Sequence, residues 1–384
     1  MSGRDSNEPH RASSPLELLF DLTFVVAVAQ VATGLAHAVS SGHLLDNGLV
    51  PYLTVFFAIW WAWINFTWFA SAYDTDDVPY RLLSMLQMGG VLVLAAGVPA
   101  VFQHNDFLGI TIGYVIMRIA AVAQWVRAGI ESPEGRVTAF RYATGVAVVQ
   151  VGWVARLFLP DQFGLASFLF LALAEIAVPL WAEHPGLTPW HAQHIAERYS
   201  LFTIILLGES VSAATIAVQG IVTVHGVNVR LLFVAIAGLV LLFAMWWLYF
   251  MERPSDGLAA RTGRTFLWGY GHYFLFAAVA AVGAALEVAV EEPHRMTDLA
   301  VGYALAVPVA IYLVMLAAVT SVLRVPLATP APATAAAVVL VLLMPLATPA
   351  IGVPGVVTAI ALVAAALTAT SIAVGVRRGA TAKA

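Results

Sequence analysis

Cysteine is absent from the 384-residue chain, so the protein can form no disulfide, use no thiol in catalysis and bind no metal through thiolates. Charged residues are also scarce: Asp, Glu, Lys and Arg make up 10% of the sequence, whereas soluble domains carry about 25%. So few charges cannot cover a water-exposed surface. The formal net charge of −4 gives no reason to expect a nucleic acid partner.

Apolar residues make up 61% of the chain, and the mean hydropathy is +0.88. A bilayer core about 30 Å thick needs roughly 20 apolar helical residues to cross it, and a segment in lipid must satisfy its own backbone polar groups. We therefore predict an all-α, polytopic transmembrane bundle of about twelve helices. The predicted spans are 16–39, 49–72, 80–102, 106–128, 138–159, 163–181, 196–219, 229–252, 265–288, 299–323, 333–350 and 353–376.

The last two predicted spans are rich in Ala and Val, and prolines lie between and within them, at Pro345, Pro349 and Pro354. These two runs could form either two full spans or a hairpin that does not cross the membrane. Both alternatives stay open from the sequence.

Lys and Arg are distributed unequally between the two sides of the predicted bundle. Side A, which includes the N-terminus, carries Arg4, Arg11, Arg81, Arg127, Arg136, Arg141, Arg198, Arg253, Arg261, Arg264, Arg324, Arg377, Arg378 and Lys383. Side B carries Arg156, Arg230 and Arg295, and Arg118 lies within a helix. Because positive loops stay in the cytoplasm, we expect a bacterial cytoplasmic (inner) membrane protein with both termini inside.

A faint internal repeat divides the chain into two parallel six-helix halves, an arrangement known among transporters. The matched positions are Glu17 and Thr23 with Glu197 and Thr203, Trp60-Trp61 with Trp246-Trp247, and Gln87 with His272. Chance alignment of apolar helices explains them equally well. The predicted parts are a cytoplasmic N-terminus over 1–15, the halves 16–181 and 182–376, and a cytoplasmic tail over 377–384.

Several segments are similar to the bacterial low temperature requirement A (LtrA) family. They are residues 16–25 at the opening, the acidic segment 74–83, Met117-Arg118, residues 194–203, residues 207–210 and residues 269–273. The resemblance extends over about residues 16–320, and Ser200 stands where the family usually has Gly. It implies a multi-spanning bacterial membrane protein, and it supplies no reaction, substrate or cofactor.

A first candidate site is a charge cluster at the cytoplasmic mouth. Glu17 and Asp21 lie one helical turn apart and share a face. Intramembrane carboxylates favour a functional role by default, so the pair could bind a proton or cation. The alternative is an ion pair with Arg81 or Arg198.

Three acids follow the second predicted helix, at Asp74, Asp76 and Asp77. Oxygen-rich clusters suit Mg²⁺ or Ca²⁺, but the spacing lacks the glycine and distal glutamate of a calcium loop. We favour a solvated turn that caps the next helix and pairs with Arg81.

His194, Glu197 and nearby histidines do not have the HExxH spacing of a zinc site. No metal site and no catalytic residue is therefore predicted.

A second candidate site lies at mid-membrane depth. Arg118 and Glu209 each fall near the middle of a predicted span, and a lone charge there costs at least about 2.5–3.5 kcal/mol. We therefore expect the two to face each other in a solute or ion site. The polar residues at depths that could line the same cavity are Gln30, Asn65, Gln87 and His272.

Two further features have mainly structural interpretations. Tryptophans at 60, 61, 63 and 68 could pack the bundle or line an organic ligand pocket. Gly109 and Gly113 have the GxxxG spacing that permits close helix contact, which is a weak motif by itself.

Three functions remain open. Buried charge and two six-helix halves favour a secondary transporter or permease for a small solute or ion. The alternatives are a non-catalytic membrane protein that supports cold adaptation or assembly, and a membrane-embedded enzyme acting on lipid. The lipid bilayer is the one expected partner in every case, and cofactors and oligomeric state are left undetermined.

Overall fold

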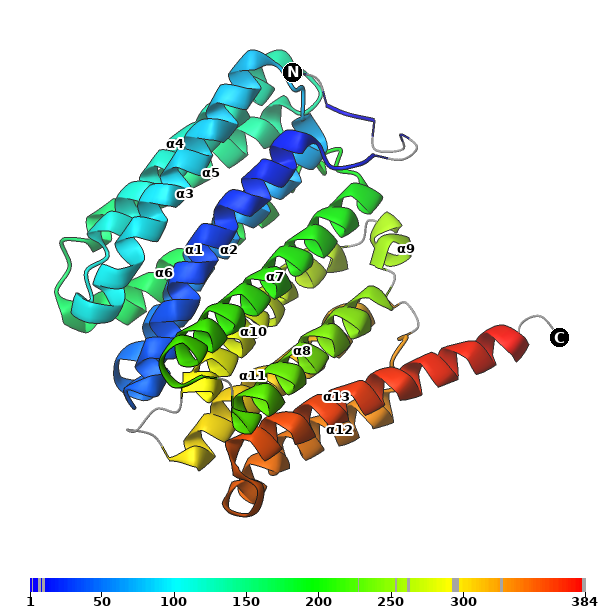
Figure 1. Ribbon diagram of the computed structural model, residues 1–384. Helices are drawn as coiled ribbons and strands as arrows, with labels where there is room; N and C mark the ends of the chain where they lie inside the picture. The colour runs from blue at the N-terminus through cyan, green and yellow to red at the C-terminus, as the bar shows by residue number, and fades with distance from the viewer. Residues whose placement is uncertain are drawn as a thin grey trace. The chain divides into compact units, whose positions relative to one another are not determined.

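The computed structural model describes residues 1, 3–5, 8, 11–226, 228–252, 254–260, 263–291, 297–324 and 327–381. Within these ranges every regular element is a helix, which confirms the predicted all-α fold (Figure 1). The α-helices are α1 (Pro15–Ser40), α2 (Leu49–Tyr73), α3 (Val78–His104), α4 (Leu108–Glu131), α5 (Arg136–Arg156), α6 (Gly164–Ala182), α7 (Ala192–His225), α8 (Val229–Phe250), α9 (Pro254–Ala259), α10 (Arg264–Glu291), α11 (Asp298–Val322), α12 (Ala331–Leu343) and α13 (Thr348–Thr381). Short helical turns occur at Leu44–Gly48, Asp161–Phe163 and Met344–Ala347.

Helix lengths and hydropathy fit a membrane-spanning bundle. A helical segment lies over each of the twelve predicted spans. Ten segments of the described chain are long and apolar enough to cross a membrane, and α12 with α13 counts as one of them. The more polar α5, which carries three arginines, is not among the ten.

The chain divides into two compact units. Unit 1 comprises Met1–Val31 and Val50–Arg198, and unit 2 comprises Ala32–Leu49 and Tyr199–Ala384. Both α1 and α7 contribute residues to each unit. The boundary after Arg198 lies 17 residues beyond the one predicted at 181, and the relation of the two halves as a repeat stays a prediction.

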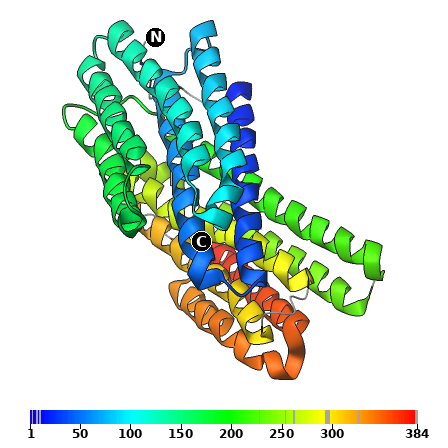
Figure 2. The same ribbon diagram turned by 90° about the vertical axis from the view of Figure 1, so that its left-hand side faces the viewer.

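In unit 1, consecutive helices from α3 to α6 pack side by side (Figure 2). The α3–α4 contact is especially close because glycines face each other across it. A Cβ added at Gly90 would lie 2.7 Å from the carbonyl oxygen of Gly113, and one added at Gly109 would lie 2.9 Å from Cα of Gly97. The predicted GxxxG pair of α4 thus lies in a tight helix interface.

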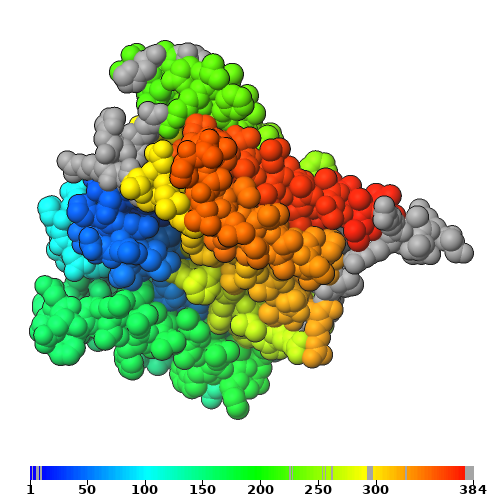
Figure 3. Space-filling model, turned by 90° about the horizontal axis from the view of Figure 1, so that it is seen from below, coloured from blue at the N-terminus to red at the C-terminus, as the bar shows by residue number. Residues whose placement is uncertain are grey.

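In unit 2, α10 is buried along most of its length and packs against α11. The last two helices, α12 and α13, pack against each other and against α11, and they form the orange and red surface in Figure 3. Near its start α13 breaks at Gly352, whose φ of 66° suits a residue without a side chain. Residues after this break form a helix long enough to cross a membrane.

Candidate functional site

Unit 1 contains a buried ion pair between Arg118 of α4 and Glu175 of α6. Nη2 of Arg118 lies 3.6 Å from Oε2 of Glu175, and the two side chains are 2% and 1% exposed. Arg118 is ten residues into α4 and Glu175 is eleven residues into α6, which corresponds to roughly 15–17 Å along each helix. Both charges therefore reach the middle of a bilayer core about 30 Å thick.

Glu175 accepts hydrogen bonds from three aromatic side chains in addition to its contact with Arg118. Tyr114 donates its hydroxyl to Oε1 at 3.0 Å, and the indole of Trp153 donates to the same oxygen at 3.2 Å. Trp61 donates its indole N–H to Oε2 at 2.8 Å. An ionised carboxylate is purely an acceptor, so donors on both oxygens fit a charged Glu175. We call Arg118, Glu175, Tyr114, Trp61 and Trp153 the central cluster.

Tyr114 connects the two charges directly. Arg118 donates to the Tyr114 hydroxyl, which in turn donates to Glu175. The guanidinium also lies 4.5 Å from the centre of the Tyr114 ring. The cluster therefore balances one positive and one negative charge away from water, as buried ion pairs require.

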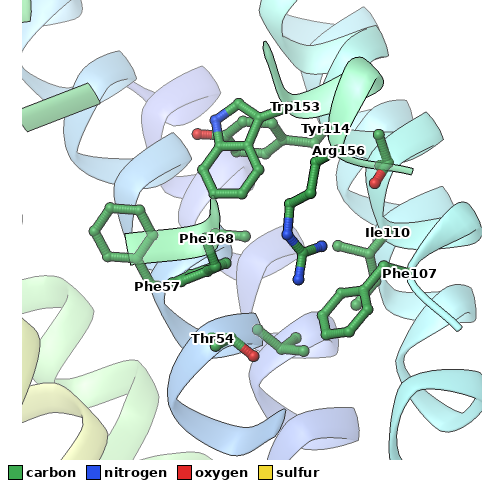
Figure 4. Close-up of a pocket in the computed structure, with 11 residues that line it drawn as sticks. Thr54, Phe57, Phe107, Ile110, Tyr114, Trp153, Arg156 and Phe168 are labelled. Atoms are coloured by element: carbon green, nitrogen blue, oxygen red, sulfur yellow. The ribbon is translucent and has the colours of Figure 1, made fainter. Parts of the chain in front are cut away.

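A pocket adjoins the central cluster and shares Tyr114 and Trp153 with it (Figure 4). The pocket lies between α2, α4, α5 and α6, and aromatic side chains form much of its wall. Its lining residues are Thr54, Val55, Phe57, Ala58, Phe107, Ile110, Thr111, Tyr114, Trp153, Arg156 and Phe168. A molecule in this pocket would touch two of the side chains that hold Glu175 in place.

A second charged cluster in unit 1 joins the first turns of α1 and α7. Glu17 lies 3.0 Å from Nε2 of His194 and 3.2 Å from Nη1 of Arg198. Arg198 also contacts Asp21, which accepts the indole N–H of Trp63 at 2.7 Å. All four of the charged or titratable side chains are at most 1% exposed. The structure thus places Arg198 beside both predicted carboxylates.

The acidic turn between α2 and α3 pairs with arginines and caps a helix. Asp76 accepts hydrogen bonds from Arg81 at 2.8 and 2.7 Å. Asp77 is the N-cap of α3, since its side chain accepts the backbone N–H of Tyr80 at 3.0 Å. It also pairs with Arg127 of α4, with N–O distances of 2.7 and 2.5 Å. Hydrogen bonds from Arg127 lower the pKa of Asp77 below its usual range.

Asp74 and Arg11 are buried near this turn. Burial raises the pKa of Asp74, whose side chain accepts the backbone N–H of Asp76 at 3.0 Å. Burial lowers the pKa of Arg11, which donates to the backbone carbonyls of Ser71 and Ala70. Glu197 accepts the backbone N–H of Ser13 at 3.1 Å. These contacts join the residues before α1 to the ends of α2 and α7.

The residues predicted for the mid-membrane site have separate surroundings. The carboxylate beside Arg118 is Glu175 of the same unit, whereas the sequence predicted Glu209, which belongs to unit 2. Depth along the helices does not distinguish Glu175 from Glu209, because the sequence does not say which helices are neighbours. Glu209 as a functional carboxylate stays a prediction.

The other predicted polar residues each have local contacts. Gln87 donates to Gln124 of α4 at 2.8 Å. Asn65 donates to the carbonyl of Trp61 in its own helix at 2.7 Å, and Gln30 is exposed. His272 of unit 2 lies 2.8 Å from the carbonyl oxygen of Trp268 and 3.3 Å from the Tyr249 hydroxyl. Their membership of one ligand cavity stays a prediction.

Sequence reasoning also missed Tyr114, Trp153 and Arg156. One signal was available for Glu175, because it is the one acid in the apolar run 163–181, and an intramembrane acid needs a partner. The aromatic donors carried no such signal, since periodicity alone does not separate packing from hydrogen bonding. Among the described residues, no three His, Asp or Glu side chains are grouped so that they could hold a metal ion.

Comparison with known proteins gives one family and one curated relative. The family described as bacterial low temperature requirement A protein matches residues 12–367. An uncharacterized protein of Rhizobium meliloti (strain 1021) is 24% identical over 311 residues, which cover 76% of this chain and 73% of that protein. No solved structure matches the chain. The family match includes all residues of the central cluster and of the adjoining pocket.

Proposed function

Because the chain belongs to the bacterial low temperature requirement A family, whose model matches residues 12–367, and is a multi-pass helical membrane protein, we propose that it is a secondary transporter or permease for a small solute. The observation that carries this proposal is the pocket that shares Tyr114 and Trp153 with the buried Arg118–Glu175 pair. Charged residues inside a membrane bundle commonly mark substrate or ion pathways.

Shared side chains give a physical route from ligand binding to helix movement. A ligand that shifts Tyr114 or Trp153 weakens their hydrogen bonds to Glu175. Since α4, α5 and α6 all contribute to this cluster, a change in these bonds alters the contacts among three helices. A ligand can shift a conformational equilibrium only through such differential contacts.

We further propose the orientation that the Lys and Arg distribution favours, with both termini in the cytoplasm. In this orientation the end of α5 at Arg156 and the start of α4 at Leu108 face the outside. The pocket then lies on the outer side of the central cluster, and the first turns of α1 and α7 lie on the inner side. A solute would enter the pocket from outside and meet the central cluster at mid-membrane.

The test is electrical recording from purified full-length protein reconstituted in liposomes on a solid support. A panel of monocarboxylates, dicarboxylates, amino acids, sugars and inorganic ions is applied to the wild-type protein and to Glu175→Gln. We expect a current with at least one solute class in the wild type and its loss in the variant. Glu134→Gln is the matched control, because Glu134 is exposed in the loop before α5, and it should keep the wild-type current.

A second candidate is a non-catalytic membrane protein that supports growth in the cold. The surroundings of Glu175 favour this structural role, because donors on both oxygens satisfy the carboxylate within the protein. Under this hypothesis the ion pair only holds helices together, and no solute of the panel gives a current. Glu175→Gln would then lower the unfolding temperature of the purified protein without changing any transport signal. Absence of current in the wild-type protein across the whole panel rejects electrogenic transport of these solutes.

A further inference from the structure

Arg156, the last residue of α5, differs from three other arginines of unit 1. Arg118, Arg127 and Arg198 each lie within 4.0 Å of a carboxylate oxygen. Within the described residues no carboxylate pairs with Arg156. Its hydrogen bonds go to one backbone carbonyl, that of Gly164, at 3.3 Å from Nε and 3.1 Å from Nη2.

The surroundings of Arg156 are apolar and aromatic. Its guanidinium lies 4.6 Å from the ring centre of Phe107 and 5.8 Å from that of Phe168. Figure 4 shows the side chain extending into the pocket, with Phe57 and Phe168 on one side and Phe107 on the other. A half-buried guanidinium has five N–H donors, so those not used by Gly164 can bind an acceptor that enters the pocket.

Charge and size restrict what this acceptor can be. Among the described residues that line the pocket, Arg156 is the one charged side chain, so a ligand with a single negative charge would balance it. The cavity volume is about 30 Å³, and a single water needs roughly 10–15 Å³. The space therefore suits a group of a few heavy atoms. The aromatic wall offers contacts for apolar carbon but few hydrogen bonds.

We propose that this pocket binds a small monocarboxylate, with the carboxylate on Arg156 and the short alkyl chain against Phe57 and Phe168. Arginine presents paired N–H donors that match the two oxygens of a carboxylate. This inference rests on the proposed function, since it names the substrate class of the same site. Binding itself is measurable without transport.

The test uses full-length protein purified in an uncharged detergent and titrated with butyrate. A ligand that binds the folded state raises the unfolding temperature in a saturable way. Butyramide has the same shape without the charge, and chloride has the charge without the alkyl chain. We expect butyrate to bind at least about tenfold more tightly than either, because hydrogen bonds to charged groups are the stronger ones.

Two variants locate the site. Arg156→Gln should weaken butyrate binding about tenfold or more. Arg141→Gln is a matched control, since Arg141 also lies on α5, donates to a backbone carbonyl and lies 5.4 Å from an aromatic ring centre. It should bind butyrate as the wild type does. Ala58→Leu fills the cavity while Arg156 remains, and it should also lose binding.

Several results overturn the inference: no saturable stabilisation by butyrate, equal affinity for butyramide or chloride, or equal weakening in the Arg156 and Arg141 variants. The comparison of the three ligands uses only the wild-type protein. It therefore tests the inference even if Arg156→Gln does not fold. Butyrate binding without any liposome current supports this site and rejects electrogenic transport of butyrate. A current with another solute, without butyrate binding, supports transport and rejects this site.

Discussion

Asp77 stabilises the start of α3 through two different interactions. Its carboxylate caps the helix at the N–H of Tyr80, and it pairs with Arg127 of the neighbouring helix. Substitution by Asn keeps an acceptor for the cap but removes the charge, whereas Ala removes both. We expect a loss of about 0–1 kcal/mol for Asp77→Asn, since the pair is partly exposed. Asp77→Ala should lose a further 0.5–2 kcal/mol, roughly, with the cap.

The pH dependence of this stabilisation follows from the lowered pKa of Asp77. A carboxyl group with a lower pKa in the folded state stabilises the fold above its unfolded pKa of about 4. This contribution declines as the pH falls from there towards the lowered pKa. Unfolding temperatures measured between about pH 3 and pH 7 should therefore show the largest gap between wild type and Asp77→Asn near neutral pH. A gap that widens on acidification contradicts the pairing with Arg127.

At the residue scale, charge and spacing were the informative signals in the sequence. Glu17 and Asp21 share a helix face, and the structure places Arg198 beside both. The sequence did not identify Glu175 as the partner of Arg118. Partners at equal depth on different helices cannot be ranked without knowing which helices are neighbours. The sequence also left open whether the tryptophans do more than pack. Trp61 and Trp63 donate to buried acids, and that depends on the exact direction of each indole.

At the scale of elements, glycines set the distance between α3 and α4. A Cβ at Gly90 would lie 2.7 Å from both the Gly113 carbonyl oxygen and Cγ of Met117, while one at the adjacent Gly89 would have no atom within 4 Å. Gly90→Ala should therefore push the helices apart and cost about 1–3 kcal/mol. Gly89→Ala should be neutral or stabilising by up to about 1 kcal/mol, because Ala is the better helix former.

Thermal unfolding of the two purified variants, compared with wild type, measures this difference. The two glycines are neighbours in one helix, so composition and depth are matched. Equal unfolding temperatures for both variants would show that the close α3–α4 contact contributes nothing measurable. The GxxxG spacing at Gly109 and Gly113 indicated this interface from sequence, but its partner glycines at Gly90 and Gly97 of α3 have a spacing of seven and were not recognised.

At the scale of the whole molecule, hydropathy predicted the helices well because the bilayer imposes a minimum length. The fold class and the approximate positions of the helices follow from that constraint. Hydropathy could not predict the break at Gly352, where a single residue with φ of 66° separates the start of α13 from its long continuation. The side of the membrane on which a loop lies depends on the number of helices that cross before it. The loop between α12 and α13 therefore lies outside only if α12 crosses the membrane.

Helix lengths favour two full crossings for α12 and α13. The 13 residues of α12 extend about 20 Å, and the turn Met344–Ala347 continues it. Residues 353–376 of α13 extend about 36 Å, more than the roughly 30 Å core. Two crossings place Ala350 outside and Ala331 inside. A hairpin that does not cross would leave Ala350 away from the outer surface.

The absence of cysteine makes the wild-type chain a ready background for single-cysteine labelling. We expect a membrane-impermeant thiol reagent added to intact cells to label Leu45→Cys and Ala350→Cys, which replace exposed residues. Glu134→Cys and Ala331→Cys, also exposed in the structure, should react only after the cells are permeabilised, because the Lys and Arg distribution places both inside. Labelling of Leu45→Cys and Glu134→Cys from the same side would refute the orientation. Labelling of Ala350→Cys only after permeabilisation would leave the orientation of the helices from α1 to α11 unchanged. It would show that α12 and α13 form a hairpin that enters and leaves on the inner side.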